Sequence, residues 1–187
     1  MKFLKKHWGN ILFVVIILLL LIPQTRLPIQ VMINRIVSFS PSEIKATERE
    51  QLSNYNWNIE NKKGEVVNFT KSKNQLTLIN YWATWFGPCI AEMPSLQALY
   101  DKYINDMDFY FITSEQPNTV EKFMNKKGFD LPIHYFISDP PKLLQSRSLP
   151  TTFIIDQNGK IIFKKSGAAN WNSKLVRQTL DDLIQDK

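Results

Sequence analysis

The chain has one cysteine, Cys89, and the residues around it indicate thiol chemistry. An apolar run of strand length at residues 76–82 is followed by Gly87-Pro88 and then by a helical pattern, so Cys89 lies at the start of a predicted helix. Backbone N–H groups at a helix start favour negative charge and lower the pKa of a cysteine placed there. Such a thiolate attacks disulfides, and a second cysteine nearby resolves the mixed disulfide that forms.

The composition limits this chemistry. With one cysteine in 187 residues, the chain cannot form an intramolecular disulfide, a multi-cysteine zinc site or an iron–sulfur cluster by itself. The two histidines, His7 and His134, are far from Cys89 in the sequence. We therefore expect no metal site and no cofactor.

The net charge of +6 is distributed unevenly. Residues 1–50 carry seven basic and three acidic side chains, whereas residues 51–187 carry sixteen and fourteen. A nucleic-acid-binding domain would carry a basic stripe on its folded part, and residues 51–187 have no such excess. We therefore expect no nucleic-acid partner.

The first 26 residues read as a membrane segment. Lys2, Lys5 and Lys6 precede an apolar run at residues 11–22 that ends at Pro23, and no small-x-small cleavage pattern follows. This pattern favours an uncleaved signal anchor over a cleaved leader. By the positive-inside rule, the N-terminus of this single-pass protein is cytoplasmic and the rest is extracytoplasmic, in the periplasm.

Residues 27–52 form a second region, an amphipathic segment followed by a linker. Its apolar residues recur at helical spacing, at positions 29, 32, 33, 36, 37 and 39. Such a helix either lies on the outer face of the membrane or packs against the chain's own domain.

Residues 53–187 form the folded domain. Strands are expected near residues 55–59, 66–69, 76–82, 109–113, 133–137, 152–156 and 160–163. Helices are expected at residues 88–103 with a kink at Pro94, at 118–127 between an Asn118 cap and a Gly128 stop, at 141–144 and at 172–185. This order predicts the α/β class, with a mixed central sheet flanked by helices.

The segment from Trp82 to Leu96, WATWFGPCIAEMPSL, resembles the active-site stretch of membrane-anchored, extracytoplasmic thioredoxin-fold proteins of the TlpA and ResA type. The resemblance implies a thioredoxin-like fold for residues 53–187 and membership of a thiol-disulfide oxidoreductase family. Residues 149–153, LPTTF, are similar to the family's cis-proline loop, which implies a cis bond between Leu149 and Pro150.

One departure from the family pattern affects activity. The family has Trp-Cys-x-x-Cys, and this chain has Phe86 in place of the first, nucleophilic cysteine. Cys89 matches the second, resolving cysteine. Its role is either that of a small buried apolar side chain or that of a monothiol, so whether the chain is an enzyme stays open.

The resemblance also implies a groove for polypeptide clients. It would be formed by Trp85, Phe86, Gly87 and Pro88 facing Leu149, Pro150 and Thr151. Three functions fit: binding of clients or of thiol and disulfide proteins without dithiol turnover, monothiol oxidoreductase chemistry through Cys89, and a structural scaffold.

Two further residues bear on the thiol. Glu92 matches the family pattern and either tunes Cys89 or is a solvated first-turn glutamate. Asn80 occupies the strand position at which thioredoxins carry a buried acid, and an asparagine cannot titrate.

Overall fold

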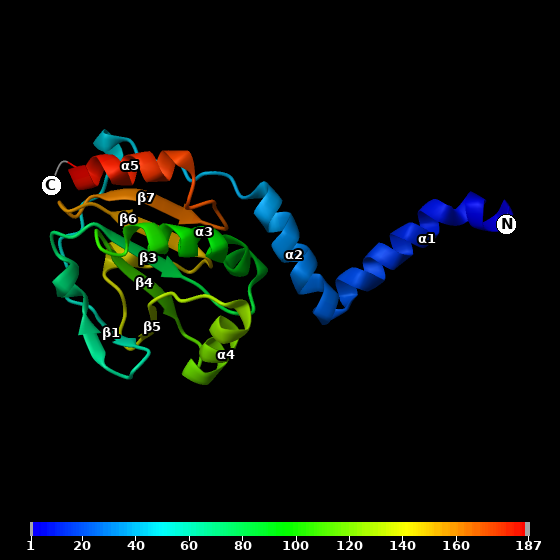
Figure 1. The fold of residues 1–187 in the computed structure, drawn as a ribbon, viewed down its shortest axis with the longest axis horizontal. Helices are drawn as coiled ribbons and strands as arrows, with labels where there is room; N and C mark the ends of the chain where they lie inside the picture. The colour runs from blue at the N-terminus through cyan, green and yellow to red at the C-terminus, as the bar shows by residue number, and fades with distance from the viewer. Residues whose placement is uncertain (1, 186–187) are drawn as a thin grey trace.

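The computed structural model describes residues 2–185, which form a mixed sheet covered by helices and joined to two N-terminal helices (Figure 1). The helices are α1 (Lys2–Leu21), α2 (Pro23–Val37), α3 (Gly87–Tyr103), α4 (Pro117–Lys127) and α5 (Lys174–Gln185). The strands are β1 (Asn58–Asn61), β2 (Val66–Asn68), β3 (Thr77–Tyr81), β4 (Asp108–Thr113), β5 (Ile133–Phe136), β6 (Thr151–Ile155) and β7 (Ile161–Ser166). Short 3-10 helices lie at Ala46–Glu48, Phe69–Ser72 and Lys142–Leu144.

The seven strands form one sheet in the order β2-β1-β5-β4-β3-β6-β7. Strands β3, β4 and β5 are parallel, and β6 runs antiparallel to β3 with Tyr81 opposite Thr151. Since the chain adds β4 and β5 on one side of β3 and β6 and β7 on the other, β3 is the point at which the strand order reverses. Such reversal points are where open α/β sheets bind ligands.

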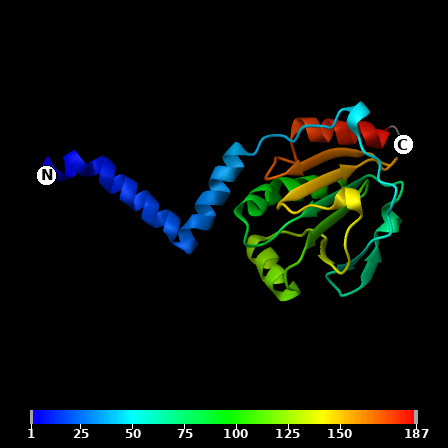
Figure 2. The same ribbon diagram turned by 180° about the vertical axis from the view of Figure 1, so that it is seen from behind.

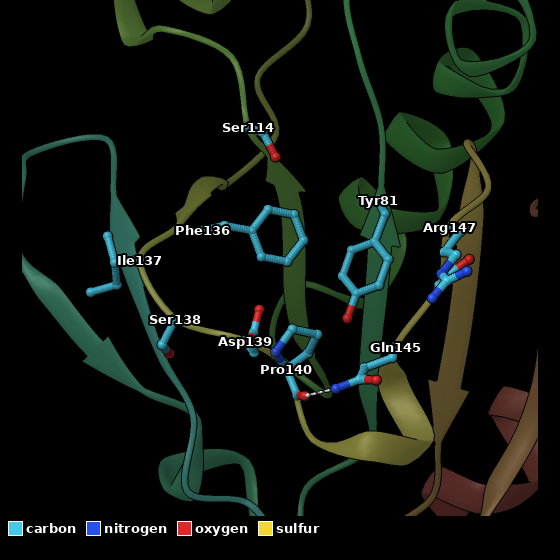
Figure 3. A pocket seen from close by; sticks show the side chains of 10 residues that line it. Tyr81, Ser114, Phe136, Ile137, Ser138, Asp139, Pro140, Gln145 and Arg147 are labelled. Atoms are coloured by element: carbon cyan, nitrogen blue, oxygen red, sulfur yellow. Dashed lines mark hydrogen bonds between the residues drawn. The ribbon is translucent and has the colours of Figure 1, made fainter.

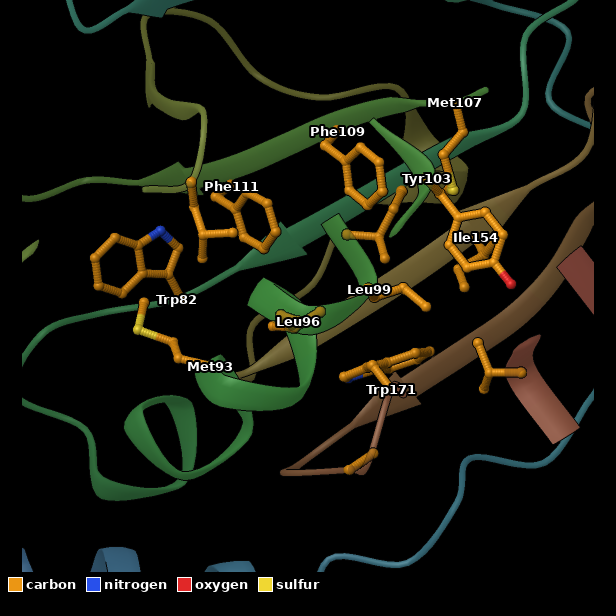
Figure 4. Close-up of a cluster of buried hydrophobic side chains, with 14 of the residues drawn as sticks. Trp82, Met93, Leu96, Leu99, Tyr103, Met107, Phe109, Phe111, Ile154 and Trp171 are labelled. Carbon is orange, nitrogen blue, oxygen red and sulfur yellow. The ribbon is translucent and has the colours of Figure 1, made fainter. Parts of the chain in front are cut away.

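Each face of the sheet has its own core. Alternate residues of β3 point to opposite faces, Leu78 to one and Ile79 to the other. The first face is covered by α3, α4 and α5, whose buried side chains pack with Phe111 and Trp171 (Figure 4). The second face is covered by the segment before β1 and by the 3-10 helices, with no longer helix among the described residues. The predicted α/β class with a mixed sheet is confirmed.

The ends of the helices follow local sequence. Gly128 ends α4 in a left-handed conformation (φ 71°), as expected, and its N–H donates to the Met124 carbonyl. The start of α4 was placed wrongly: the helix begins at Pro117, with Gln116 rather than Asn118 as the cap residue. Proline at a first helical position has its φ already set for the helix, and this preference prevails over the asparagine cap.

The N-terminal residues form two helices that project away from the domain (Figures 1 and 2). Helix α1 ends where Ile22, with extended ψ of 118°, precedes Pro23. No helix in the described part of the chain is long and apolar enough to cross a membrane. The membrane span expected over residues 1–26 is therefore not confirmed, because only residues 11–22 of that region are continuously apolar.

The second N-terminal region contacts the domain. Helix α2 packs against α3 near Gly87, through Gln30 and Leu27. The apolar stripe does not make this contact as a whole, because Met32 and Ile33 are 59% and 50% exposed, and the choice between the two alternatives stays open. The residues after it run beside β7, where the Ile44 N–H donates to the Ile162 carbonyl at 2.8 Å and the Leu52 N–H to the Gly159 carbonyl at 2.8 Å. The stretch expected as a linker is thus attached to the sheet.

Candidate functional site

The chain leaves β3 at Tyr81 and turns into α3 through residues 82–86. Glu115, in the loop after β4, holds this turn: its carboxylate accepts hydrogen bonds from the Thr84 backbone N–H (2.5 Å) and from Thr84 Oγ1 (2.7 Å). Phe86 is the cap residue of α3 and supplies no side-chain acceptor for the exposed helix N–H groups. The turn is therefore fixed by a carboxylate from a neighbouring loop.

Cys89 lies in the first turn of α3 with 1% of its surface exposed, and it is a free thiol. The pKa of Cys89 is raised to about 12, chiefly by burial and to a smaller extent by the nearby Glu92 and Glu115 carboxylates. Hydrogen bonds from the backbone of Ala83 and of Cys89 itself act in the opposite direction. Burial outweighs the helix-start effect that the sequence suggested. At neutral pH this thiol is protonated.

Glu92 is buried beneath the turn, at 1% exposure. Its carboxylate accepts hydrogen bonds from Asn80 Nδ2 (2.8 Å), Trp171 Nε1 (3.1 Å) and the Ala169 backbone N–H (3.2 Å). The pKa of Glu92 is raised to about 8, because the effect of burial exceeds the lowering by these three donors. The interpretation of Glu92 as a solvated first-turn glutamate is wrong, because its side chain is buried and hydrogen-bonded to Asn80, Ala169 and Trp171.

Trp85 and Phe86 form the rim of the site. Trp85 is 65% exposed, whereas Phe86 is half-buried and packs against the core beneath α3. Their rings lie 5.6 Å apart at 57°. The residue at the nucleophile position is thus an apolar ring that joins an exposed tryptophan to the core.

The loop before β6 meets this rim at the same end of the sheet. The bond between Leu149 and Pro150 is cis, as the resemblance implied. Pro150 is buried, and its carbonyl accepts a hydrogen bond from the Gly167 N–H at 2.9 Å. Because Tyr81 pairs with Thr151, the residues that follow Tyr81 and those that precede Thr151 leave the sheet side by side.

Helix α2 covers one side of the turn. A Cβ atom added to Gly87 would lie 3.2 Å from Gln30 Cβ and 3.7 Å from Leu27 Cδ1. Contacts of this length leave no room for a side chain at position 87 unless α2 moves. Gly87 is buried as a result, and access to the rim is from the side of Trp85.

The structure places all the candidate site residues at one end of the sheet. They lie in two groups, Trp85, Phe86, Gly87, Pro88 and Cys89 at the start of α3, and Leu149, Pro150 and Thr151 at the start of β6. Sequence reasoning missed Glu115, Trp171 and Gln30, which shape the site from distant segments. Only Glu115 gave a signal, since it follows an apolar strand at the end where the motif lies.

A family model described as Redoxin matches residues 45–183. The chain is 27% identical over 117 residues to the thiol-disulfide oxidoreductase ResA of Halalkalibacterium halodurans, covering 60% of this chain and 65% of that one. It is 30% identical over 125 residues to the ResA protein of Geobacillus thermodenitrificans, covering 64% and 70%.

A solved structure of a related kind has a similar fold. A secreted thiol-disulfide isomerase from Corynebacterium glutamicum superposes with a TM-score of 0.57 at 19% identity, over 78% of this chain and 92% of that one. The fold is therefore thioredoxin-like. Because the Redoxin match covers most of the described domain, the chain belongs to the Redoxin family and is related to thiol-disulfide oxidoreductases of the ResA type.

Proposed function

We propose that this protein binds polypeptide clients in the groove between the start of α3 and the cis-proline loop, without dithiol redox turnover. The observation that supports this most directly is the combination of Phe86 at the nucleophile position with a buried, high-pKa thiol at Cys89. The scaffold around them, including the cis bond before Pro150, is retained.

The absence of turnover follows from the chemistry of exchange. Dithiol reduction needs an exposed thiolate to form the mixed disulfide and a second thiol to resolve it. A phenylalanine ring supplies no nucleophile, and the only cysteine is 1% exposed. Monothiol chemistry through Cys89 is disfavoured for the same reason, because the thiolate is the reactive form and burial keeps Cys89 protonated.

A groove that can still bind clients is supported by backbone groups in the cis-proline loop that have no hydrogen-bond partner among the described residues. Among the described residues, no hydrogen bond engages the backbone N–H or carbonyl of Leu149, the residue before the cis bond. An extended client can pair with such a free backbone by strand addition. Trp85, at 65% exposure and at the same end of the sheet, is an available apolar contact for the client. A purely structural scaffold would not need either feature.

The client-binding proposal can be tested with insulin B chain whose cysteines have been alkylated, since this probe has no thiol to exchange. We expect saturable binding to the wild-type chain that weakens about tenfold in Trp85→Ala and in Pro150→Ala. Ile104→Ala, which removes an exposed apolar side chain at the other end of α3, is the control and should bind as the wild type does. Equal binding by all four proteins would contradict the proposal.

We further propose that the domain is extracytoplasmic and is held at the membrane by its N-terminal residues, with the lysine-rich end in the cytoplasm. The large apolar side chains of α1 whose burial the structure describes are exposed, Trp8 at 68% and Phe13 at 65% among them. Protease added to intact spheroplasts should degrade the domain, which should also sediment with membranes. Protection of the domain until the cells are lysed would contradict this location.

A further inference from the structure

A cavity lies at the end of the sheet that carries Cys89 and the cis-proline loop, on the sheet face that no long helix covers among the described residues. The connection from β5 to β6, residues 137–150, crosses this face with only one short 3-10 helix, and it leaves an open cavity of about 910 Å³. This volume is near the upper end of the range of roughly 300–1,000 Å³ for ligand pockets. The cavity lies outside the carboxyl ends of β3, β4 and β5, where the strand order reverses.

The floor of the cavity is aromatic and preformed. Tyr81 and Phe136 lie side by side in its centre (Figure 3), with ring centroids 5.2 Å apart at 55°. Trp57 packs against both rings from below, and Tyr81 Oη donates to the Leu144 carbonyl at 2.9 Å. Tyr81 is only 3% exposed, whereas Phe136 is partly exposed. A flat apolar group could therefore pack against Phe136, which Tyr81 and Trp57 hold in place, with little rearrangement.

Two charged side chains line this cavity, Arg147 and Asp139. Arg147 lies beyond Tyr81 and Asp139 lies below Phe136 (Figure 3). Both side chains are exposed, and neither makes an ion pair with another residue that the structure describes. The guanidinium of Arg147 is therefore available to a carboxylate of an occupant, in the two-pronged geometry that arginine favours.

The wall that carries Arg147 is continuous with the client groove. Arg147 precedes Leu149 by two residues, and Ser146 Oγ lies 2.9 Å from Thr151 Oγ1, which ties the wall to the start of β6. A polypeptide paired with the Leu149 backbone would therefore meet Arg147 first as it continued over the sheet end. Asp139 is ten residues before Leu149 in the same connection.

We propose that this cavity is the specificity pocket for the client, accepting an aromatic side chain against Phe136 and an adjacent acidic side chain at Arg147. The inference rests on the proposed client binding and names the class of sequence that the groove selects. The occupant is an extended segment, because the cavity opens to the surface and adjoins the free backbone of Leu149.

Two fluorescein-labelled octapeptides test the pocket, one with Glu-Phe and one with Lys-Phe at its centre, each with Gly and Ser elsewhere. By fluorescence anisotropy the full-length wild-type chain should bind the Glu-Phe peptide about tenfold more tightly. Arg147→Glu should reverse this order. Lys142→Glu, an exposed charge change on the same connection outside the cavity, should leave the order unchanged.

Failure of this inference can be separated from failure of client binding. If both peptides bind equally well, and if Pro150→Ala weakens both while Arg147→Glu changes neither, the pocket proposal is overturned and the groove remains. If neither peptide binds and the alkylated insulin chain does, the pocket proposal is again overturned. Loss of all three interactions in the wild type would overturn both proposals.

Discussion

Cys89 and Glu92 lie one helical turn apart in α3, and burial raises the pKa of both. The sequence favours a reactive thiol at this position, because a helix start stabilises a thiolate. In the folded chain, desolvation exceeds that effect, and the Glu92 carboxylate adds to it. The residue that matches the resolving cysteine therefore behaves as a small buried apolar side chain.

The first prediction concerns Cys89. Since its pKa rises from 9.0 to about 12, iodoacetamide at pH 8 should alkylate the native thiol roughly a thousandfold more slowly than the urea-unfolded thiol. Mass spectrometry over a time course measures both rates. Comparable rates would show that the thiol is accessible and ionised in the folded chain.

The second prediction concerns Glu92. Its pKa is higher in the folded chain (about 8) than in the unfolded chain (4.5), so the folded state binds the extra proton, and stability falls as pH rises towards 8. Between pH 7 and 9 the wild type should lose roughly 1–2 kcal/mol of unfolding free energy. Urea titrations of Glu92→Gln should show no such loss.

The pH range separates the effect of Glu92 from that of His134, whose pKa is also shifted. Burial lowers the pKa of His134 to about 4, so His134 is neutral in the folded chain throughout this range and largely neutral in the unfolded chain. His134→Gln is therefore the matched control and should keep the wild-type slope. An equal slope in Glu92→Gln would mean that another group binds the proton.

At the scale of elements, the docking of α2 on α3 depends on the small size of Gly87. Gly87→Leu would place a side chain where Gln30 Cβ lies, so we expect α2 to detach. Trypsin should then cleave after Arg26 and Arg35 several-fold faster. Asp101→Leu, which adds the same bulk at an exposed position near the other end of α3, should keep the wild-type cleavage rate.

Most elements could be predicted from local pattern. Strand β3 and the β6–β7 hairpin follow from apolar runs and from Asn158-Gly159, where Gly159 takes a φ of +80°. The stop of α4 follows from Gly128 in the same way. These features are specified by residues close together in the sequence, so they can be predicted without knowing the rest of the fold.

The features that could not be predicted involve distant segments. Glu92 reads as a first-turn glutamate until Trp171, seventy-nine residues later, is known to donate to it. Likewise, nothing in residues 23–37 specifies that their helix meets Gly87. The site motif and its cis-proline were found through resemblance, whereas the electrostatics of the site arise from tertiary packing.

At the scale of the whole molecule, the domain keeps a thioredoxin-like architecture around a turn that carries Phe86 and one buried cysteine. Both sheet faces have dense cores, and the cis-proline loop lies at the start of α3. A decayed domain would be expected to lose such features along with the cysteine. Their retention is consistent with a groove that still binds clients.

The proposed function requires an intact scaffold in which only the nucleophilic cysteine has been replaced, by Phe86. The most direct test is insulin disulfide reduction with dithiothreitol as the electron donor, in the wild type, Phe86→Cys and Phe86→Ser. We predict that the wild type and Phe86→Ser match dithiothreitol alone, whereas Phe86→Cys is several-fold faster because it restores the thiol pair. Wild-type turnover above background that Cys89→Ser abolishes would contradict the account.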